Sequence, residues 1–445
     1  MVSQALNVWM NGILVGMWSV DRSAHTFRYE ASWLDSPRRR SLSLSLPISS
    51  SLEIKGDAVK NYFDNLLPDN DKIRSRLAKR FNAKSDTFAL LEAIGRDCVG
   101  AVQLLPDGVL PDGWNRINCE PLSNGKIADI LQAIPADAGP AHNEDELFRI
   151  SIAGAQEKTA FTLWNGQWCH PRGSTPTTHI FKLPLGFVPL KGAVLDMSNS
   201  VQNEWLCAQI VAAFGLQTAT TSMLTFGEQT VLVVERFDRE WRDDDSWIAR
   251  LPQEDFCQAL AVPPEKKYEE HGGPGMLQCL QLLQGSVDKD DTMRFLLTQL
   301  IFFLLAASDG HAKNFSIFLG HEDAYEMTPL YDILSVWPYL GKGAHQLSPQ
   351  KAGAAMAIRS KNAHYRFRDM HTRHWHQLAM KNGGPVIWSA MVLLVLSVDE
   401  VLAKVAPQLP INFQEHTWTS IAEGMRAEAK RFLSGITKEQ LPDIQ

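Results

Sequence analysis

The residues Ser308–Phe315, SDGHAKNF, directly follow one of the two longest apolar runs of the chain, Leu296–Ala307. They place Asp309 four residues before Lys313 and five residues before Asn314. The apolar run is too short to cross a bilayer, so it predicts a buried helix. The polar residues would then be presented together at the end of that helix.

A second acidic residue, Asp332, lies in the segment Leu330–Ile333 (LYDI), 18 residues after Asn314, which leaves room for a short hairpin. Such a pair of aspartates around an asparagine is typical of the catalytic loop and metal-binding segment of protein kinases. There the first carboxylate accepts a hydroxyl proton, while the amide oxygen and the second carboxylate bind Mg²⁺. Asp309 is therefore the candidate base. Because this spacing is common by chance, a turn with solvent-exposed caps is the alternative.

A buried lysine is the matching signal upstream. Lys182 lies inside the apolar strand Ile180–Pro184, where an amine is costly unless it reaches water or an anion. It is a candidate phosphate-binding lysine, and an edge-strand lysine that reaches solvent is the alternative. Glu204, on the predicted helix Val201–Phe214, could hold this amine, or it could be a surface residue. We expect Lys182 to converge with the candidate base and metal ligands around a magnesium–nucleotide pair.

Two further segments are candidates for nucleotide binding, one for the phosphates and one for the adenine ring. Small residues with accessible backbone N–H groups can wrap phosphates, and one such loop joins the predicted strands Phe148–Ile152 and Thr159–Trp164. Its residues are Ala153, Gly154, Ala155, Gln156, Glu157 and Lys158. It is not a P-loop, because a P-loop joins a strand to a helix. The stretch Val233–Phe237 lies at the end of a predicted buried strand. A hinge segment in this position can pair with adenine through its backbone groups, so this stretch is the candidate adenine-binding segment.

Composition limits the class of protein. The 445 residues are 45% hydrophobic and 21% charged, with a formal net charge of -7, which excludes general disorder and a polycation that coats nucleic acid. Six cysteines without a C-x-x-C pair exclude a zinc ribbon or disulfide scaffold and predict reduced thiols. No signal peptide is expected at the N-terminus, so a soluble, cytoplasmic protein without membrane contact is the simplest expectation.

The first hundred residues predict a mixed domain. Asn11-Gly12 predicts a tight hairpin turn, and the alternation of Leu and Ser over Leu42–Leu46 predicts a half-buried strand. Helices are expected over Asp57–Leu67, Asp71–Phe81 and Ser85–Ile94. The main domain boundary is expected at the proline-rich stretch 135–140, and the chain should become mostly helical after about residue 250.

Many segments, in one order along nearly the whole chain, resemble the HipA toxin kinases, the toxin half of HipA–HipB type II toxin–antitoxin modules. They are Leu42–Pro47 (LSLSLP), Tyr62–Asp69 (YFDNLLPD), Gly95–Val102 (GRDCVGAV), Ile150–Thr159 (ISIAGAQEKT), Thr175–Pro184 (TPTTHIFKLP), Val234–Arg239 (VERFDR), Arg250–Cys257 (RLPQEDFC), Gly272–Gly275 (GGPG), Asp309–Ser316 (DGHAKNFS) and Leu330–Ile333 (LYDI). The resemblance implies an α+β, bilobal, protein-kinase-like fold. Residues 1–140 would form an extra N-terminal α/β domain, residues 141–240 the kinase N-lobe and residues 241–445 a mostly helical C-lobe.

The resemblance also implies roles for individual residues. Asp309 would be the catalytic base, Asn314 and Asp332 would bind Mg²⁺, Lys182 would hold ATP phosphates, and residues 153–158 would form a flexible phosphate loop. The remaining nucleotide contacts would come from the backbone of Glu235 and Phe237 and from His311, Lys313 and Tyr331. Ser151 would be autophosphorylated, and the added charge would repel nucleotide and silence the kinase.

The implied function is an ATP- and Mg²⁺-dependent serine/threonine kinase toxin. Its implied substrate is an aminoacyl-tRNA synthetase, with the glutamyl type as the first guess, so that translation stops and the cell becomes dormant. The implied partners are a small dimeric HipB-like helix-turn-helix antitoxin and, through it, operator DNA. Two alternatives stay open: a non-catalytic corepressor that uses the basic helix around Lys72–Arg80, and a small-molecule phosphotransferase with the same site.

Overall fold

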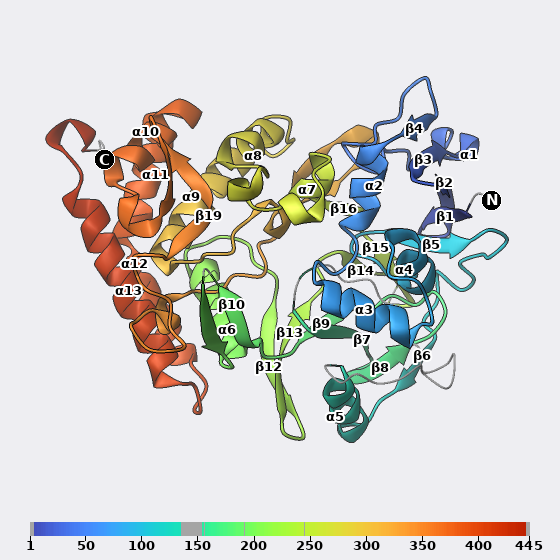
Figure 1. The fold of residues 1–445 in the computed structure, drawn as a ribbon, viewed down its shortest axis with the longest axis horizontal. Coiled ribbons are helices and arrows are strands. Elements are labelled where there is room, and N and C mark those ends of the chain that lie inside the picture. Colours follow the sequence, from blue (N-terminus) through green and yellow to red (C-terminus); the bar gives the residue numbers. More distant parts are fainter. Residues whose placement is uncertain (1–3, 135–153, 155, 191, 244, 442–445) are drawn as a thin grey trace. The chain divides into compact units, whose positions relative to one another are not determined.

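The computed structural model describes residues 4–134, 154, 156–190, 192–243 and 245–441. The chain divides into two compact units, each made of three segments. Unit 1 contains residues 1–183, 224–267 and 316–328, and unit 2 contains residues 184–223, 268–315 and 329–445. Figure 1 labels the helices and strands of both units.

The first part of unit 1 is a five-stranded antiparallel sheet with small helices. The strands are β1 (Gln4–Met10), β2 (Ile13–Asp21), β3 (Ala24–Tyr29), β4 (Glu53–Lys55) and β5 (Val102–Pro106), and the helices are α1 (Ala31–Leu34), α2 (Asp57–Asp64), α3 (Asp71–Arg80) and α4 (Thr87–Ile94). The strand order is β4-β3-β2-β1-β5. The three predicted helices are confirmed, with ends that differ by up to three residues.

The predicted hairpin at the start of the chain is confirmed. Met10 of β1 pairs with Ile13 of β2, and the two residues between them, Asn11 and Gly12, have φ angles of 46° and 78°. Positive φ at both positions is what a type I′ turn requires. The sheet that follows buries Trp18, which stacks on Phe63 of α2 with 4.1 Å between the ring centroids.

The strand predicted over Leu42–Leu46 is wrong. The segment forms a turn with one isolated bridge between Ser43 and Leu46. Ser43 accepts a hydrogen bond from the backbone N–H of Ser45 on its own side-chain oxygen (3.0 Å), which favours a turn over a ladder. Leu42 and Leu46 are nevertheless buried, because the two ends of the turn both enter the core.

A six-stranded sheet forms the second part of unit 1. Its elements are β6 (Cys119–Pro121), α5 (Asn124–Ala133), β7 (Lys158–Trp164), β8 (Gln167–Pro171), β9 (His179–Lys182), β12 (Thr221–Phe226) and β13 (Gln229–Glu235). The strand order is β12-β13-β9-β7-β8-β6. Ile127 and Leu131 of α5 share one core with Phe161 and Phe181, whose rings meet edge-on at 4.8 Å. The predicted strands near residues 159, 179 and 230 are confirmed, and the one over 148–152 lies outside the described residues.

Small elements complete unit 1. They are the hairpin of β14 (Arg239–Arg242) and β15 (Trp247–Arg250), helix α7 (Phe256–Ala259), and the sheet β16 (Gln253–Asp255), β17 (Ser316–Leu319) and β18 (Tyr325–Met327). Strands β17 and β18 pair as a hairpin in the interval between Asn314 and Asp332. The short hairpin predicted there is confirmed.

Unit 2 is mostly helical. Its strands are β10 (Gly186–Leu190), β11 (Ala193–Met197), β19 (Gly353–Arg359) and β20 (Ala363–Arg366), and its helices are α6 (Ser200–Ala213), α8 (Met276–Leu283), α9 (Asp291–Leu305), α10 (Thr372–Asn382), α11 (Pro385–Leu396), α12 (Val398–Val405) and α13 (Glu415–Ser434). The expectation of a mostly helical chain after residue 250 holds for this unit. The hairpin β19–β20 interrupts the helices, and its residues Ala355 and Ala357 are buried.

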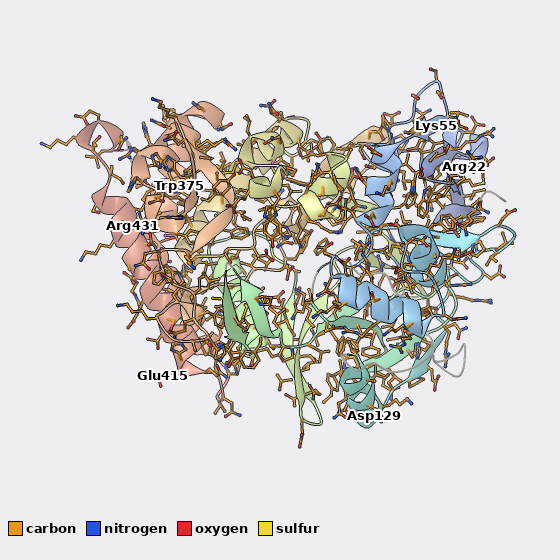
Figure 2. The ribbon with its side chains drawn as sticks, viewed as in Figure 1. Arg22, Lys55, Asp129, Trp375, Glu415 and Arg431 are labelled. Carbon is orange, nitrogen blue, oxygen red and sulfur yellow. The ribbon has the colours of Figure 1, made fainter. Side chains whose placement is uncertain are left out.

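Helix α9 is the core of unit 2. Residues Phe295 to Leu305 are buried with few interruptions, as the apolar run predicted. Phe303 contacts Trp375 of α10, with ring centroids 5.5 Å apart, and the guanidinium of Arg431 on α13 lies 5.1 Å from its centroid. Figure 2 labels Trp375 and Arg431. Helix α13 packs against α9, and the segment that contains Asp309 follows the C-terminal end of α9.

In the part of the chain that the structure describes, no single helix is long and apolar enough to cross a membrane. The bent pair Pro385–Leu396 and Val398–Gln408, at 50° to each other, meets that test only when taken together. All six cysteines are described, and all are free thiols.

Candidate active site

The candidate base follows a sharp end of helix α9. Ala306 caps the helix in the left-handed region (φ 48°), and Asp309 follows three residues later with its side chain 51% exposed. A Cβ at Gly310 would lie 2.4 Å from the Phe302 ring, so only glycine fits there. The buried helix therefore presents a solvent-accessible carboxylate on a tightly packed turn.

The carboxamide of Asn314 closes this turn. Its Nδ2 donates to the backbone carbonyl of Asp309 (2.8 Å), and the backbone N–H of His311 donates to the same carbonyl (2.8 Å). The 3₁₀ turn Ala312–Asn314 keeps the two residues close. Because Nδ2 is committed to the backbone, Oδ1 is the atom that Asn314 can offer to a cation.

Two neighbours surround the Asp309 carboxylate. Tyr268 donates its phenolic hydrogen bond to Asp309 Oδ1, and its ring meets the buried His311 ring edge-on at 4.8 Å. His311 Nε2 lies 3.8 Å from the same oxygen. The sequence prediction missed Tyr268, although its position four residues before the Gly272–Gly275 motif was a usable signal.

Asp332 sits on strained backbone that its neighbours hold in place. Its φ is 60°, a left-handed conformation that aspartate tolerates better than most residues. Leu330 just before it exchanges backbone hydrogen bonds with Gln217 and Ala219 (2.9 and 2.8 Å). Tyr331 donates from its hydroxyl to the carbonyl of Lys313 (3.1 Å), which ties this segment to the turn that carries Asp309 and Asn314.

Helix α6 anchors the residues after Asp332. Asn203 donates from Nδ2 to the carbonyl of Ser335 (2.8 Å) and accepts the Ser335 N–H on Oδ1 (2.9 Å). Glu204, its neighbour, is buried, so the prediction that it could be a surface residue is wrong. Asn203 is a second residue that the sequence did not single out, because a buried asparagine leaves no spacing pattern.

Lys182, the candidate phosphate-binding lysine, belongs to unit 1. It is buried, and β9 lies between β13 and β7 rather than at an edge, so the edge-strand alternative is wrong. Its partner in the register of β7 is Lys158. Directly opposite residues of an antiparallel pair point to the same face, so two amines occupy one face of the sheet.

The described residues of the predicted phosphate loop lie beside this lysine pair. Gly154 has φ 107°, its carbonyl accepts the N–H of Asp69 (3.1 Å), and a Cβ on it would lie 2.7 Å from the Lys158 amine. Gln156 donates from Nε2 to the carbonyl of Leu183 (2.5 Å). Ser151, Ala153 and Ala155 lie outside the described residues.

Glu157, also in this loop, has its own contacts. Its carboxylate pairs with Arg76 of α3, and its carbonyl accepts the Leu183 N–H (3.1 Å). The stretch that follows β9 is therefore held to the loop by backbone contacts. The predicted basic helix is α3, and its cations are partly neutralised. Arg76 pairs with Glu157, and Arg74 pairs with Asp64 (2.8 Å).

The predicted adenine-binding stretch is held by a buried charge network. Arg236, between Glu235 and Phe237, donates its backbone N–H to Thr178 (2.9 Å), and its guanidinium lies 3.3 Å from Asp97. Two more arginines reach the same carboxylate, Arg239 at 3.0 Å and Arg250 at 3.0 Å.

Burial by itself would raise the pKa of Asp97, but the three guanidinium groups outweigh that effect and hold it far below its usual value. The carboxylate therefore stays charged and fixes the backbone of residues 235–237. We did not predict this role for Asp97 from the sequence, because the three arginines are more than 130 residues away.

Each unit by itself offers part of the chemistry that a nucleotide needs. Unit 2 supplies an amide oxygen and a carboxylate, the hard oxygen donors that Mg²⁺ prefers. Within the described residues no group of three or more His, Cys, Asp or Glu side chains could hold a metal ion. Unit 1 supplies paired amines suited to an anion.

Comparisons with known proteins agree with this chemistry. A family model described as HipA-like C-terminal domain matches residues 150–409, and one described as HipA N-terminal domain matches residues 6–105. The chain is 33% identical over 417 residues to a putative kinase, Y4mE, of Sinorhizobium fredii, covering 91% of this chain and 92% of that protein. It is 28% identical over 357 residues to the serine/threonine-protein kinase toxin HipA of Shewanella oneidensis, covering 75% and 76%.

A solved structure gives the fold. The chain matches a structure of the Shewanella oneidensis toxin–antitoxin system HipA, HipB and operator DNA complex with a TM-score of 0.78, at 23% identity, covering 99% of this chain and 100% of that one. The predicted α+β, kinase-like fold class is confirmed. On the strength of both domain models and the full-length relative, the chain belongs to the HipA family of serine/threonine kinases.

Proposed function

We propose that the chain is an ATP- and Mg²⁺-dependent serine/threonine protein kinase that acts as the toxin of a type II toxin–antitoxin module. The observation that carries the proposal is the closed turn in which Asn314 binds the backbone of Asp309 while the Asp309 carboxylate stays exposed. This contact holds the carboxamide of Asn314 in a fixed position relative to the backbone of Asp309, as positioned catalytic groups require. We also propose the division into residues 1–140, 141–240 and 241–445.

The residues fit the absent cofactors. Asn314 Oδ1 and the Asp332 carboxylate would hold Mg²⁺, Lys182 and Lys158 would bind ATP phosphates together with residues 153–157, and the backbone of Glu235 and Phe237 would pair with adenine. When bound, the ion would neutralise charge that develops on the phosphates. His311, Lys313 and Tyr331 would line the phosphates.

The chain's own residues would supply the proton chemistry and the orientation. Asp309 accepts the proton of a serine or threonine hydroxyl as that oxygen attacks the terminal phosphate. The Asn314–Asp309 contact and the Leu330 backbone pairs keep the base and the metal ligands in fixed positions before substrate arrives. Catalysis of this kind depends mostly on such positioning.

We propose the same partners that the family resemblance implies. The Shewanella relative's structure contains HipB and operator DNA, and a HipB-like helix-turn-helix antitoxin dimer that brings this chain to operator DNA is the proposed assembly. The proposed substrate is an aminoacyl-tRNA synthetase, the glutamyl type first, and the proposed location is the cytoplasm. Autophosphorylation of Ser151 would add a charge of about −2 and weaken ATP binding.

The test is labelling with Mg-ATP. Purified protein is incubated with γ-labelled ATP, alone and with a lysate, and labelled sites are mapped by mass spectrometry. We expect label on Ser151 and on a synthetase, and its loss in Asp309→Asn. The matched control is Asp399→Asn, an exposed aspartate on α12.

Each alternative has its own outcome. Label that persists unchanged in Asp309→Asn contradicts the proposed base. Label on small molecules but on no protein indicates a small-molecule phosphotransferase. Growth arrest that survives both Asp309→Asn and Lys182→Met indicates a corepressor that acts by binding.

A further inference from the structure

Tyr268 makes a contact with the candidate base that no part of the sequence prediction assigned. Its phenolic hydroxyl donates to Oδ1 of Asp309. The Tyr268 ring packs edge-on against His311, at 4.8 Å and 86°, and against His271, at 5.7 Å and 70°. His311 itself stays 3.8 Å from the same oxygen, beyond hydrogen-bond distance.

The backbone that carries Tyr268 is firmly held. The carbonyl of Tyr268 accepts the N–H groups of His271 and Gly273, both at 3.0 Å. The next residue, Glu269, is buried, and its Oε2 accepts the backbone N–H of Ala357 (2.6 Å) while its Oε1 accepts Nε of Arg359 (2.9 Å). Strand β19 therefore fixes the position from which the phenol reaches Asp309.

The base, by contrast, has a side chain that would turn easily. The terminal torsion of aspartate has a broad energy well, and half of the Asp309 side chain is exposed. A donor on Oδ1 selects one orientation of the carboxylate. Its other oxygen, Oδ2, then faces a defined direction.

We propose that Tyr268 is a positioning residue that holds Oδ1 of Asp309 so that Oδ2 accepts the substrate proton. This inference rests on the proposed kinase function. In the reaction the hydroxyl oxygen of the acceptor bonds to the terminal phosphorus, its proton passes to Oδ2, and the bond from that phosphorus to the bridging oxygen breaks and releases ADP. Tyr268 keeps its own proton throughout.

The test separates the hydroxyl of Tyr268 from its ring. Tyr268→Phe keeps the packing on His311 and His271 and removes only the donor. The rate of self-labelling at saturating Mg-ATP should fall about 10-fold, while the half-saturating ATP concentration stays within about two-fold of the wild-type value. Tyr365→Phe, a tyrosine on β20 of the same unit, is the matched control and should change neither quantity.

A second variant shows whether Tyr268 acts through Asp309. In an Asp309→Asn background the residual rate should not fall further when Tyr268→Phe is added, because the group that the phenol positions is already lost. An unchanged rate in Tyr268→Phe overturns the inference, and so does a further 10-fold loss in the double variant. Wild-type protein that takes no label would overturn the proposed function and this inference with it.

Discussion

Lys158 and Lys182 face each other across the antiparallel strands β7 and β9. Like charges in directly opposite positions repel, and Lys182 is buried as well. A phosphate bound at this face of the sheet would reduce the repulsion between the two amines. A Cβ added at Gly154 would lie 2.7 Å from the Lys158 amine, so the backbone of this loop comes close to the same place.

The lysine pair predicts stabilisation by polyanions. Mg-ATP, or inorganic tripolyphosphate as a probe without adenine, should raise the Tm of the wild-type protein. At a ligand concentration 100 times Kd, binding adds about 2.7 kcal/mol to the free energy of unfolding. Lys182→Met should lose more than half of the shift, because it removes the buried amine. Thermal unfolding with and without the anion measures this, and Lys55→Met, an exposed lysine on β4, should keep the full shift. An equal shift in both variants would contradict a phosphate role for Lys182.

Substitutions at Asp332 can separate the role of this residue in the backbone conformation from its proposed role as a metal ligand. Asp332→Asn keeps a residue that tolerates φ 60° but removes the charge, so Tm should stay close to that of the wild type while kinase activity falls about 100-fold or more. Asp332→Ala should lose similar activity and about 1 kcal/mol of stability in addition. Asp332→Gly should restore that stability without activity. Thermal unfolding and self-labelling rates of the three variants test this, and an active Asp332→Asn protein would exclude a metal-ligand role.

Glu254 predicts a pH dependence of stability. It lies fully buried on β16, and its Oε1 accepts the N–H of Leu44 (2.9 Å), while Oε2 has no hydrogen-bond partner among the described residues. Burial raises its pKa to about 8. The folded protein therefore binds this proton more tightly than the unfolded chain, so its contribution to stability is lost as pH rises from about 4.5 to about 8.

The variant Glu254→Gln should remove this loss. Its Tm should exceed that of the wild type at pH 8, and the difference should shrink as pH falls toward 5. Glu265→Gln changes an exposed glutamate and should follow the wild type at every pH. Melting curves at half-unit intervals measure the difference, and a difference that does not depend on pH would show that Glu254 stays ionised.

Asp97 is expected to contribute strongly to the stability of unit 1. Asp97→Asn would leave three buried guanidinium groups with too little negative charge, and a broken buried ion pair costs about 3–5 kcal/mol. Urea unfolding should show a loss of this size. Asp129→Asn, at the exposed aspartate on α5 labelled in Figure 2, should leave the unfolding midpoint unchanged. A loss of less than about 1 kcal/mol in Asp97→Asn would contradict the proposed role of the network.

The sequence was most informative where a pattern is local. The hairpin at Asn11-Gly12, helix α9 and the strand around Lys182 follow from turn chemistry and periodicity, and all three are confirmed. The strand predicted over Leu42–Leu46 failed because serine side chains bond to nearby backbone, an effect that alternation alone does not reveal. The candidate residues around Asp309 could be identified because Asp309, Lys313 and Asn314 lie within one turn, which sets the spacing between them in the sequence.

The residues that position the site were harder to find. Tyr268, Asn203 and Asp97 act on partners that lie 41 to 153 residues away, so no local spacing in the sequence reveals the contacts that they make. Their importance comes from tertiary contacts, which a single sequence does not encode in a readable spacing. The catalytic roles of the predicted residues remain predictions for the experiments above.

The three arginines around Asp97 also bear on how proteins of this type diversify. Arg236, Arg239 and Arg250 belong to the region matched by the C-terminal domain model, whereas Asp97 belongs to the region matched by the N-terminal one. If recombination joined the two regions from unrelated ancestors, the new N-terminal region would lack a carboxylate at position 97 unless a further mutation introduced it. The three buried arginines would then have lost this partner. The two domains are therefore expected to be inherited as a pair, and chimaeras that ignore position 97 are expected to accumulate as insoluble protein.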